Sequence, residues 1–379
     1  MSSRQTRNPR YFSLTTMRTL EKLTIKGFKS IREQTLALER LNVFIGGNGV
    51  GKSNLVQVFR FLREILNKNL AGYTLTKGGA DTLLHFGRKR SPEMSFHLEF
   101  GEGDISNAYR VSLRGTDDSG LIIAEETAYY HEKEKYPRPY DHTIAINTKE
   151  SKLKQDTHIS TRQVRHDLES YRVYHFHDTS DSAAVKAPNE VEDNRVLHSQ
   201  AENLAAFLYW MQQKKPDHFA NIQDTIRQIA PFFQEFRLAP SKLKENQVRL
   251  EWKEKGSDAY FTAHALSDGT LRFICLATLL LQPDLPAVVL LDEPELGLHP
   301  AAITLLASLL SSASTRTQVI VATQSVTLVN QFEPSSVWTV DREDNQSVFR
   351  HLSKTDMSSW LDQYALGELW EKNVFGARP

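Results

Sequence analysis

A glycine-rich segment has the residue types and spacing that bind phosphate. Residues 46–53 read GGNGVGKS and satisfy G-x-x-x-x-G-K-[ST] between an apolar strand pattern and a helical one. Glycines let successive backbone N–H groups point at phosphate oxygens. We therefore expect Lys52 to reach the β- and γ-phosphates of a nucleotide and Ser53 to ligate Mg²⁺. The alternative, a glycine turn without a ligand, is disfavoured by the flanking elements. The expected phosphate-binding residues are Gly46, Gly47, Asn48, Gly49, Val50, Gly51, Lys52, Ser53 and Asn54.

Two adjacent acids follow an apolar run later in the chain. Residues 287–294 read AVVLLDEP, which places Asp292 and Glu293 at the carboxyl end of a predicted strand. In that position Asp292 can hold Mg²⁺ through water, and Glu293 can polarise an attacking water. Solvated acidic loops after core strands are common, so the pair alone is a modest signal. Together with the glycine-rich segment it indicates nucleotide hydrolysis.

Two further segments carry groups suited to a nucleotide. Residues 266–271 read LSDGTL and open a helix, with Ser267 and Gly269 at an N-terminus that attracts anions. The chain's own phosphate loop already has a helix N-terminus to bind its nucleotide, so this second N-terminus could contact a nucleotide held by a second subunit. The alternative is that Ser267 is an ordinary N-cap residue. Residues 319–325 read VIVATQS and place Gln324 after the next strand, where a γ-phosphate sensor belongs.

The elements that must position these residues alternate in type. An apolar strand at 41–45 precedes a helical pattern at 54–66. We expect helices at 271–281 and 301–312, a short helix at 326–332, and strands at 287–291, 318–322 and 337–340. Continuously apolar strands are typical of a parallel sheet covered on both faces. The predicted fold class is thus α/β, a nucleotide-binding core.

The middle of the chain reads differently. Short period-two runs between 93 and 147 predict an antiparallel sheet. The polar segments 148–165 and 178–194 indicate surface loops, and 203–236 indicates a pair of helices broken at Pro216. We therefore expect an antiparallel β subdomain followed by a central mixed and helical insertion.

Composition sets limits on partners and compartment. The 379 residues include 46 Lys and Arg and 46 Asp and Glu, so the net charge of zero excludes a globally basic nucleic-acid coat but permits a local basic groove. No apolar run is long enough to cross a membrane, so we expect no membrane partner. Cys275 is the only cysteine, which excludes an intramolecular disulfide. We expect a cytoplasmic protein.

Together the motifs carry a family resemblance. The segments TLEKLTIKGFKSI, GGNGVGKSN, LSDGT, VVLLDEPELGLHP and ATQS resemble those of ABC-type ATPases of the SMC and RecF kind. Within these, YHFHDTS and LGELWEKNVFGARP are similar to compact AAA family ATPases related to the ATPase part of overcoming-lysogenisation-defect (OLD) nucleases. The resemblance implies an ABC-type P-loop ATPase head that binds ATP and Mg²⁺, with Lys52, Glu293 and Gln324 as catalytic residues and Ser53 and Asp292 as metal ligands.

Some positions depart from the family pattern. The signature reads SDGT where ABC transporters prefer SGGQ, and Gln324 stands where most relatives place histidine. A glutamine can hydrogen-bond the γ-phosphate but cannot titrate near neutral pH, which predicts slow turnover. No Gln-loop glutamine is identifiable, and the segment between Ser53 and Ser267 has no sustained heptads, which excludes the coiled-coil arms of SMC proteins.

The resemblance divides the chain into four parts. We predict a flexible arm at 1–17, with Met17 as an alternative start, and an N-terminal ATPase lobe with the phosphate loop at 18–92. The β subdomain and helical insertion fill 93–243, and the C-terminal ATPase lobe with signature, Asp-Glu pair and switch segment fills 244–379.

The leading functional hypothesis is an ATP-hydrolysing dimerisation switch. Its partners would be a second copy in a head-to-tail dimer or a larger even oligomer, a separate nuclease or other effector in DNA processing or anti-phage defence, and possible DNA or RNA. No nuclease centre is visible in the chain. The alternatives are an ATP-binding scaffold with little turnover, a transporter nucleotide-binding subunit and a small-molecule kinase.

Two other groups of side chains could be functional. His175, His177 and Asp178 could form a metal site. The i and i+2 spacing places both histidines on one face of a strand without further ligands nearby in sequence, which favours a strand that binds no metal. Trp370, Val374 and Phe375 form either a docked tail or a partner-binding patch, and the sequence leaves both open.

Overall fold

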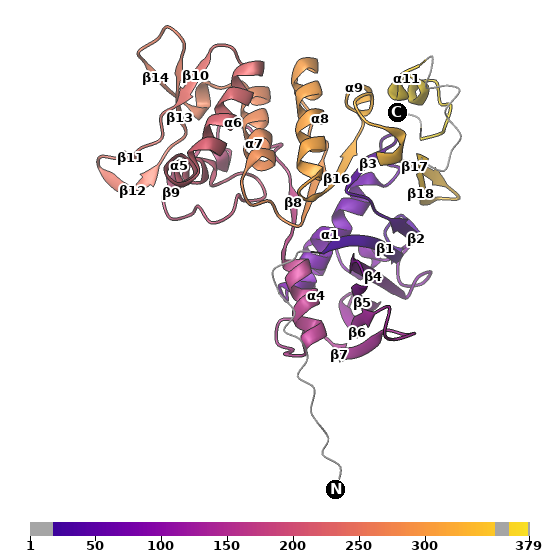
Figure 1. The fold of residues 1–379 in the computed structure, drawn as a ribbon. Helices are drawn as coiled ribbons and strands as arrows, with labels where there is room; N and C mark the ends of the chain where they lie inside the picture. Colours follow the sequence, from indigo (N-terminus) through magenta and orange to yellow (C-terminus); the bar gives the residue numbers. More distant parts are fainter. Residues whose placement is uncertain (1–17, 353–363, 378–379) are drawn as a thin grey trace.

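The computed structural model describes residues 18–352 and 364–377. The predicted arm at 1–17, including Met17, lies outside the described residues. Two six-stranded sheets, two small three-stranded sheets and the helices around them make up the described fold (Figure 1).

The strands of the two large sheets are β1 Thr19–Phe28, β2 Ile31–Ala37, β3 Leu41–Ile45, β4 Glu93–Glu102, β5 Ile105–Gly115, β6 Leu121–Glu132, β7 Tyr140–Thr148, β8 Tyr171–Tyr174, β15 Val288–Asp292, β16 Gln318–Thr323, β17 Val337–Glu343 and β18 Gln346–His351. The small sheets contain β9 Asn189–Glu190, β10 Phe233–Phe236, β11 Pro240–Ser241, β12 Lys244–Val248, β13 Glu251–Glu254 and β14 Tyr260–Thr262. The helices are α1 Lys52–Leu66, α2 Leu70–Thr76, α3 Ala80–Leu83, α4 Ile159–Glu169, α5 Leu204–Lys214, α6 Pro216–Ile229, α7 Asp268–Leu281, α8 Pro300–Ser314, α9 Val326–Val329 and α11 Leu366–Glu371, with 3-10 turns at Ala184–Lys186, Ala263–Ala265 and Pro334–Ser336.

The main sheet has the order β18-β17-β3-β16-β15-β8, and all its strands except β18 run parallel. Successive residues of β15 face opposite sides. Val289 and Leu291 join the hydrophobic core with α5 to α8, whereas Val288 and Leu290 join the core with α1. Figure 1 shows the helices α5 to α8 on one side of this sheet and α1 with the antiparallel sheet on the other. The predicted parallel sheet buried on both faces is confirmed.

The second large sheet is antiparallel, with the order β2-β1-β4-β5-β6-β7. The antiparallel sheet predicted between 93 and 147 is therefore present as β4 to β7. It also takes β1 and β2, since β1 pairs with β4 across the predicted division at residues 92 and 93. Phe28, Phe61 and Phe96 pack ring against ring and join this sheet to α1.

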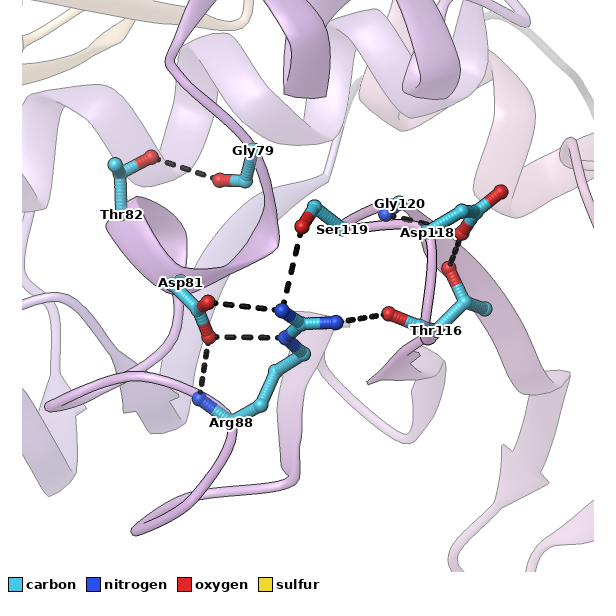
Figure 2. Close-up of polar contacts among 8 residues, drawn as sticks. All are labelled: Gly79, Asp81, Thr82, Arg88, Thr116, Asp118, Ser119 and Gly120. Carbon is cyan, nitrogen blue, oxygen red and sulfur yellow. Dashed lines mark hydrogen bonds and ion pairs between the residues drawn. The ribbon is translucent and has the colours of Figure 1, made fainter.

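A polar cluster fixes the segment before β4 to the β5–β6 hairpin (Figure 2). The Arg88 guanidinium bonds both oxygens of Asp81 at 3.0 Å and the hydroxyl of Ser119 at 3.3 Å, and it donates to the carbonyl oxygen of Thr116. The backbone N–H of Ala80 also donates to Ser119 O at 2.8 Å. The hydrogen bonds from Arg88 lower the pKa of Asp81 to about 2.

Three element predictions are wrong. Residues 178–194, which are predicted to form a surface loop, contain β9, which pairs with β12. Residues 148–165 were expected to form loops, but α4 begins at Ile159. Its buried face includes the polar side chains of Ser160, Thr161 and Gln163, which hide the helical period of apolar residues. The helix pair predicted to reach Phe236 ends at Ile229, because Pro231 follows and a residue before proline is disfavoured in the helical region. Residues 233–236 form β10 instead.

The C-terminal segment is docked. Trp370 and Leu369 on α11 are buried in the helical core, and the Gly367 N–H donates to the Asn330 side chain at 2.6 Å. The Trp370 indole N–H donates to Ala377 O. Of the two interpretations left open by the sequence, Trp370 therefore fits a docked tail. None of the helices within residues 18–352 and 364–377 is both long enough and apolar enough to span a bilayer.

Candidate nucleotide-binding site

The glycine-rich loop connects β3 to α1 at the carboxyl edge of the main sheet. Gly51 has a φ of 118° and is the N-cap of α1, and Gly49 has a φ of 77°. A Cβ added to Gly51 would lie 2.0 Å from the hydroxyl oxygen of Ser347, and one added to Gly46 would lie 2.4 Å from Val340 O. Glycine is therefore required at Gly51 for both conformation and space.

Lys52 lies over this loop. Its side chain is 5% exposed, and Nζ donates to Gly46 O and to Gly47 O, the latter at 2.9 Å. Burial lowers the pKa of Lys52, whereas the negative charges of Glu293 and Asp292 oppose that shift. The ammonium group thus shares an electrostatic environment with the two acids predicted to act with it.

Three polar side chains support the loop from outside. The Ser347 hydroxyl lies 2.6 Å from that of Ser30 and donates to Val50 O. The Asn54 carboxamide donates to Ser30 at 2.7 Å, so this predicted nucleotide ligand supports the loop in the structure. Asn48, Gly49 and Ser53 are exposed. The Ser53 hydroxyl is therefore accessible to a metal ion at the first turn of α1.

Asp292 is the last residue of β15 and is suited to a metal ion. Its Oδ1 is buried and has no hydrogen-bond partner in the structure, and burial followed by the charge of Glu293 raises its pKa. No group of three or more His, Cys, Asp and Glu side chains within the described ranges could hold a metal ion. A magnesium site here would thus depend on Ser53, Asp292 and the phosphates of the nucleotide. An orphaned carboxylate oxygen and an exposed hydroxyl fit that ligand set.

Glu293 is held in an unusual conformation next to the neighbouring strand. Its φ is 46°, its N–H donates to Ala322 O at 2.7 Å, and its Oε1 accepts a hydrogen bond from the Gln324 carboxamide. Positive φ at a non-glycine residue is uncommon and clusters at functional sites. Since β3, β16 and β15 are parallel neighbours, their carboxyl ends bring Lys52, Glu293 and Gln324 to one edge of the sheet.

Sequence reasoning missed Glu295, which follows the Asp-Glu pair. Its side chain is 8% exposed and accepts hydrogen bonds from the Thr323 hydroxyl at 2.5 Å and the Gln324 N–H at 3.3 Å. Burial raises its pKa. Glu295 thus fixes the backbone that carries Gln324. An acid inside an otherwise apolar segment, PELGL, was the available signal.

His177 was considered only as a metal ligand, but the structure gives it another position. It follows β8, the parallel neighbour of β15, and its Nε2 contacts Asp292 O at 3.0 Å and Glu293 O at 3.2 Å. Both partners are carbonyl acceptors, so Nε2 carries the proton. The His175 ring lies 3.9 Å from the His177 ring, and Arg272 on α7 donates to His177 O at 2.9 Å.

The signature residues lie apart from this group. Ser267 is exposed at the N-terminus of α7, and its hydroxyl accepts a hydrogen bond from the Thr270 N–H at 3.2 Å. A Cβ on Gly269 would lie 2.6 Å from Gly297 O, so the first turn of α7 packs closely on the segment after β15. Helix α7 belongs to the core on one face of the main sheet, and α1 belongs to the core on the other. The structure thus brings Lys52, Asp292, Glu293 and Gln324 together, whereas Ser267 and Gly269 begin a helix on the face of the main sheet opposite α1.

Comparison with known proteins identifies the family and the fold. Residues 41–330 match the family described as "AAA domain, putative AbiEii toxin, Type IV TA system". The fold is similar to that of an SMC head bound to the C-winged helix domain of ScpA, with 16% identity, a TM-score of 0.58 and coverage of 88% of this chain and 98% of that one.

A second solved structure gives the same result. It is an Smc head domain with an extended coiled coil bound to the C-terminal domain of ScpA, derived from Pyrococcus furiosus, with 16% identity, a TM-score of 0.56 and coverage of 92% and 100%. No curated protein sequence matches the chain. Because the family match spans more than half of the residues, the chain belongs to this AAA-domain family, and its fold is that of an ABC-type ATPase head of the SMC kind.

Proposed function

We propose that this protein binds and slowly hydrolyses ATP, and that ATP closes two copies of the chain into a head-to-tail dimer. The observation that carries the proposal is the separation of the two halves of the site. Lys52 and Glu293 lie at the carboxyl edge of the main sheet. Ser267 is exposed at the start of α7, which packs on the face of that sheet opposite α1. Two copies related by a two-fold axis would complete two sites at once.

Each group at the sheet edge has a chemical part in this proposal. The N–H groups of the glycine-rich loop and the ammonium of Lys52 bind the phosphates. Ser53 and Asp292 would hold Mg²⁺, which neutralises charge on the phosphates when bound. Glu293 orients and polarises the attacking water, and the Gln324 carboxamide hydrogen-bonds the γ-phosphate.

Slow turnover follows from a specific contact. Gln324 donates to Glu293 in the structure, so the carboxylate that must accept a proton from water is already engaged. Hydrolysis would require Gln324 to exchange this partner for the γ-phosphate. The same contact favours the second candidate, an ATP-binding scaffold with little turnover.

The partner of the switch is also a proposal. The matched family carries a toxin and antitoxin description, and the similar SMC heads were solved with a domain of ScpA bound to them. By analogy we propose that the dimer acts with a separate effector protein, a nuclease in DNA processing or anti-phage defence. No membrane partner is proposed.

A pair of variants tests the composite site. Glu293→Gln keeps the side-chain volume and removes the base, so ATP binding should survive while hydrolysis falls ~100-fold. The ATP-bound variant should run as a dimer or larger even oligomer in light scattering with size-exclusion chromatography. Adding Ser267→Arg should abolish this assembly, because a bulky cation then occupies the place of a small hydroxyl.

Ser311→Arg, on the exposed surface of α8, is the matched control and should leave assembly unchanged. ATP-dependent assembly that persists with Ser267→Arg would show that the site works within a single chain. An inability of the wild-type protein to hydrolyse ATP at any concentration, with assembly intact, would select the scaffold instead.

A further inference from the structure

A pocket of about 610 Å³ lies between α1, β8 and the loop at 196–202. Its wall includes three arginines, Arg60 and Arg63 of α1 and Arg172 of β8, and two histidines, His175 and His198. The whole chain has a net charge of zero, so this concentration of basic side chains is local. It adjoins the nucleotide site but shares none of the loop residues 46–53.

Within the described residues, none of the three arginines forms an ion pair with a carboxylate. Arg60 makes no hydrogen bond or ion pair to any residue in the described part of the chain, although its positive charge opposes the rise in the pKa of Asp292. Arg63 donates to Tyr171 O at 3.3 Å, and Arg172 donates to Tyr171 O at 3.0 Å and to Glu169 O, so both contact only neutral carbonyl groups.

The two acids in the wall are engaged by other donors. Glu64 accepts a hydrogen bond from the Asn69 carboxamide at 2.6 Å, and Glu202 accepts one from the Gln200 N–H at 3.0 Å. Neither acid forms an ion pair with an arginine of the pocket, and the three arginines outnumber the two acids in its wall.

Arg63 and Arg172 lie close together, since both donate to the carbonyl oxygen of Tyr171. Burial, followed by the positive charge of Arg63, lowers the pKa of Arg172. Partly buried like charges are unfavourable unless an anion offsets them. Guanidinium groups bind phosphate through paired N–H donors, and a ligand with several phosphates can engage more than one of them.

We propose that this pocket binds a ligand carrying two or more neighbouring phosphates, at a site separate from the glycine-rich loop. That chemistry has two sources, a nucleic-acid strand and a soluble polyphosphate compound. The pocket volume accommodates either source at the level of two or three phosphate groups.

The pocket also contacts the proposed catalytic site. His175 lines it and lies 3.9 Å, ring to ring, from His177, whose Nε2 bonds the carbonyl oxygens of Asp292 and Glu293. An anion that orders His175 would therefore fix the backbone that carries Glu293. This coupling rests on the proposed ATPase function, whereas the binding itself does not.

Binding is tested in the full-length Lys52→Ala chain, which removes the ammonium of the other phosphate site. The probes are a short fluorescein-labelled single-stranded DNA, followed by anisotropy, and inorganic tripolyphosphate, followed by calorimetry. Arg60→Gln should weaken binding ~10-fold. The double variant Arg60→Gln with Arg172→Gln should reduce the slope of log affinity against log salt for DNA by about 1.4 in total, about 0.7 for each arginine. Arg60 makes no bond in the described fold, so Arg60→Gln should fold normally; circular dichroism checks this.

Arg162→Gln on the exposed face of α4 is the matched control and should change neither affinity. Weakening of DNA binding alone identifies a strand as the ligand, and weakening of tripolyphosphate binding alone identifies a soluble compound. If Arg60→Gln affects neither probe more than Arg162→Gln does, the pocket is not a phosphate site. With Lys52 intact, the bound probe should raise ATP turnover at least twofold. If the probe binds but turnover does not rise, the pocket is a phosphate site that is not coupled to Glu293.

Discussion

The Gln324 carboxamide donates a hydrogen bond to the Glu293 carboxylate, across two parallel neighbouring strands. The residue proposed to sense the γ-phosphate thus holds the residue proposed to activate water. Glu295 fixes the backbone of Gln324, and His177 contacts the carbonyl group of Glu293, so both ends of this contact are positioned by further buried or half-buried groups.

Replacing Gln324 tests that contact. Gln324→Ala should lower kcat for ATP ~10-fold and leave ATP affinity within about twofold, because it loses the proposed hydrogen bond to the γ-phosphate but keeps the phosphate loop. This loss should outweigh the release of Glu293 from its hydrogen bond with Gln324. Gln324→His should keep a hydrogen bond to Glu293. Because histidine titrates near neutral pH and glutamine does not, the ATPase rate of this variant should change between about pH 6 and 7. Gln331→Ala, after α9, is the control. Equal rates for Gln324→Ala and wild type would contradict this role.

His177 should act as a positioning residue. His177→Ala removes the donor to Asp292 O and Glu293 O, so kcat should fall ~10-fold with KM for ATP little changed. His177→Gln retains an N–H donor of similar reach and should recover most of the rate. His166→Ala on α4 serves as the control. A rise in KM with kcat intact would instead place His177 in nucleotide binding.

A buried acid should make stability depend on pH. Burial raises the pKa of Asp167 to about 7, against the opposing charge of Arg18 at 3.9 Å. The folded state then binds more protons than the unfolded state between pH 4 and 7, so the free energy of unfolding decreases as pH rises through that window. The full difference corresponds to ~4 kcal/mol above pH 7.

Thermal unfolding from pH 4 to 8 measures this effect. Asp167→Asn cannot ionise and should flatten the decline in melting temperature, whereas Asp104→Asn, at an exposed turn, should follow the wild-type curve. Parallel curves for all three proteins would show that Asp167 ionises in the native state without cost.

Cys275 should be unreactive in the native protein. It is buried on α7, and burial raises the pKa of its thiol to about 12. The thiolate is the reactive form, so iodoacetamide at pH 8 should add no label to the folded chain and one label in guanidinium chloride, as counted by mass spectrometry. Rapid labelling without denaturant would mean that α7 opens readily.

Patterns with a single physical cause were predictable from the sequence. The apolar run at 41–45 forms β3, and the helix predicted at 271–281 forms α7. The first is a continuous apolar run, and the second places apolar side chains at helical spacing. The glycine-rich segment also lies between a strand and a helix as expected. Helix α4 escaped detection because it buries polar side chains, among them Ser160 and Gln163.

The parts of the site that were missed depend on adjacency in space. His177 precedes Asp292 by more than one hundred residues, and only the parallel pairing of β8 with β15 brings its ring to the Asp292 carbonyl. Glu295 has a role only because Thr323 and Gln324 end the next strand. Neither relationship leaves a local period or motif in the sequence.

The central place of β3 in the main sheet has a consequence for biosynthesis. β3 and α1 are complete by residue 66, yet β3 pairs with β16 and β17, which end at residues 323 and 343. During translation the apolar residues Val43, Phe44 and Ile45 therefore emerge from the ribosome long before the strands that cover them. Contacts between residues so far apart in the sequence form slowly, and until they form the apolar surface of β3 stays exposed. This strand of the nascent chain should accordingly stay prone to aggregation until β16 and β17 are synthesised.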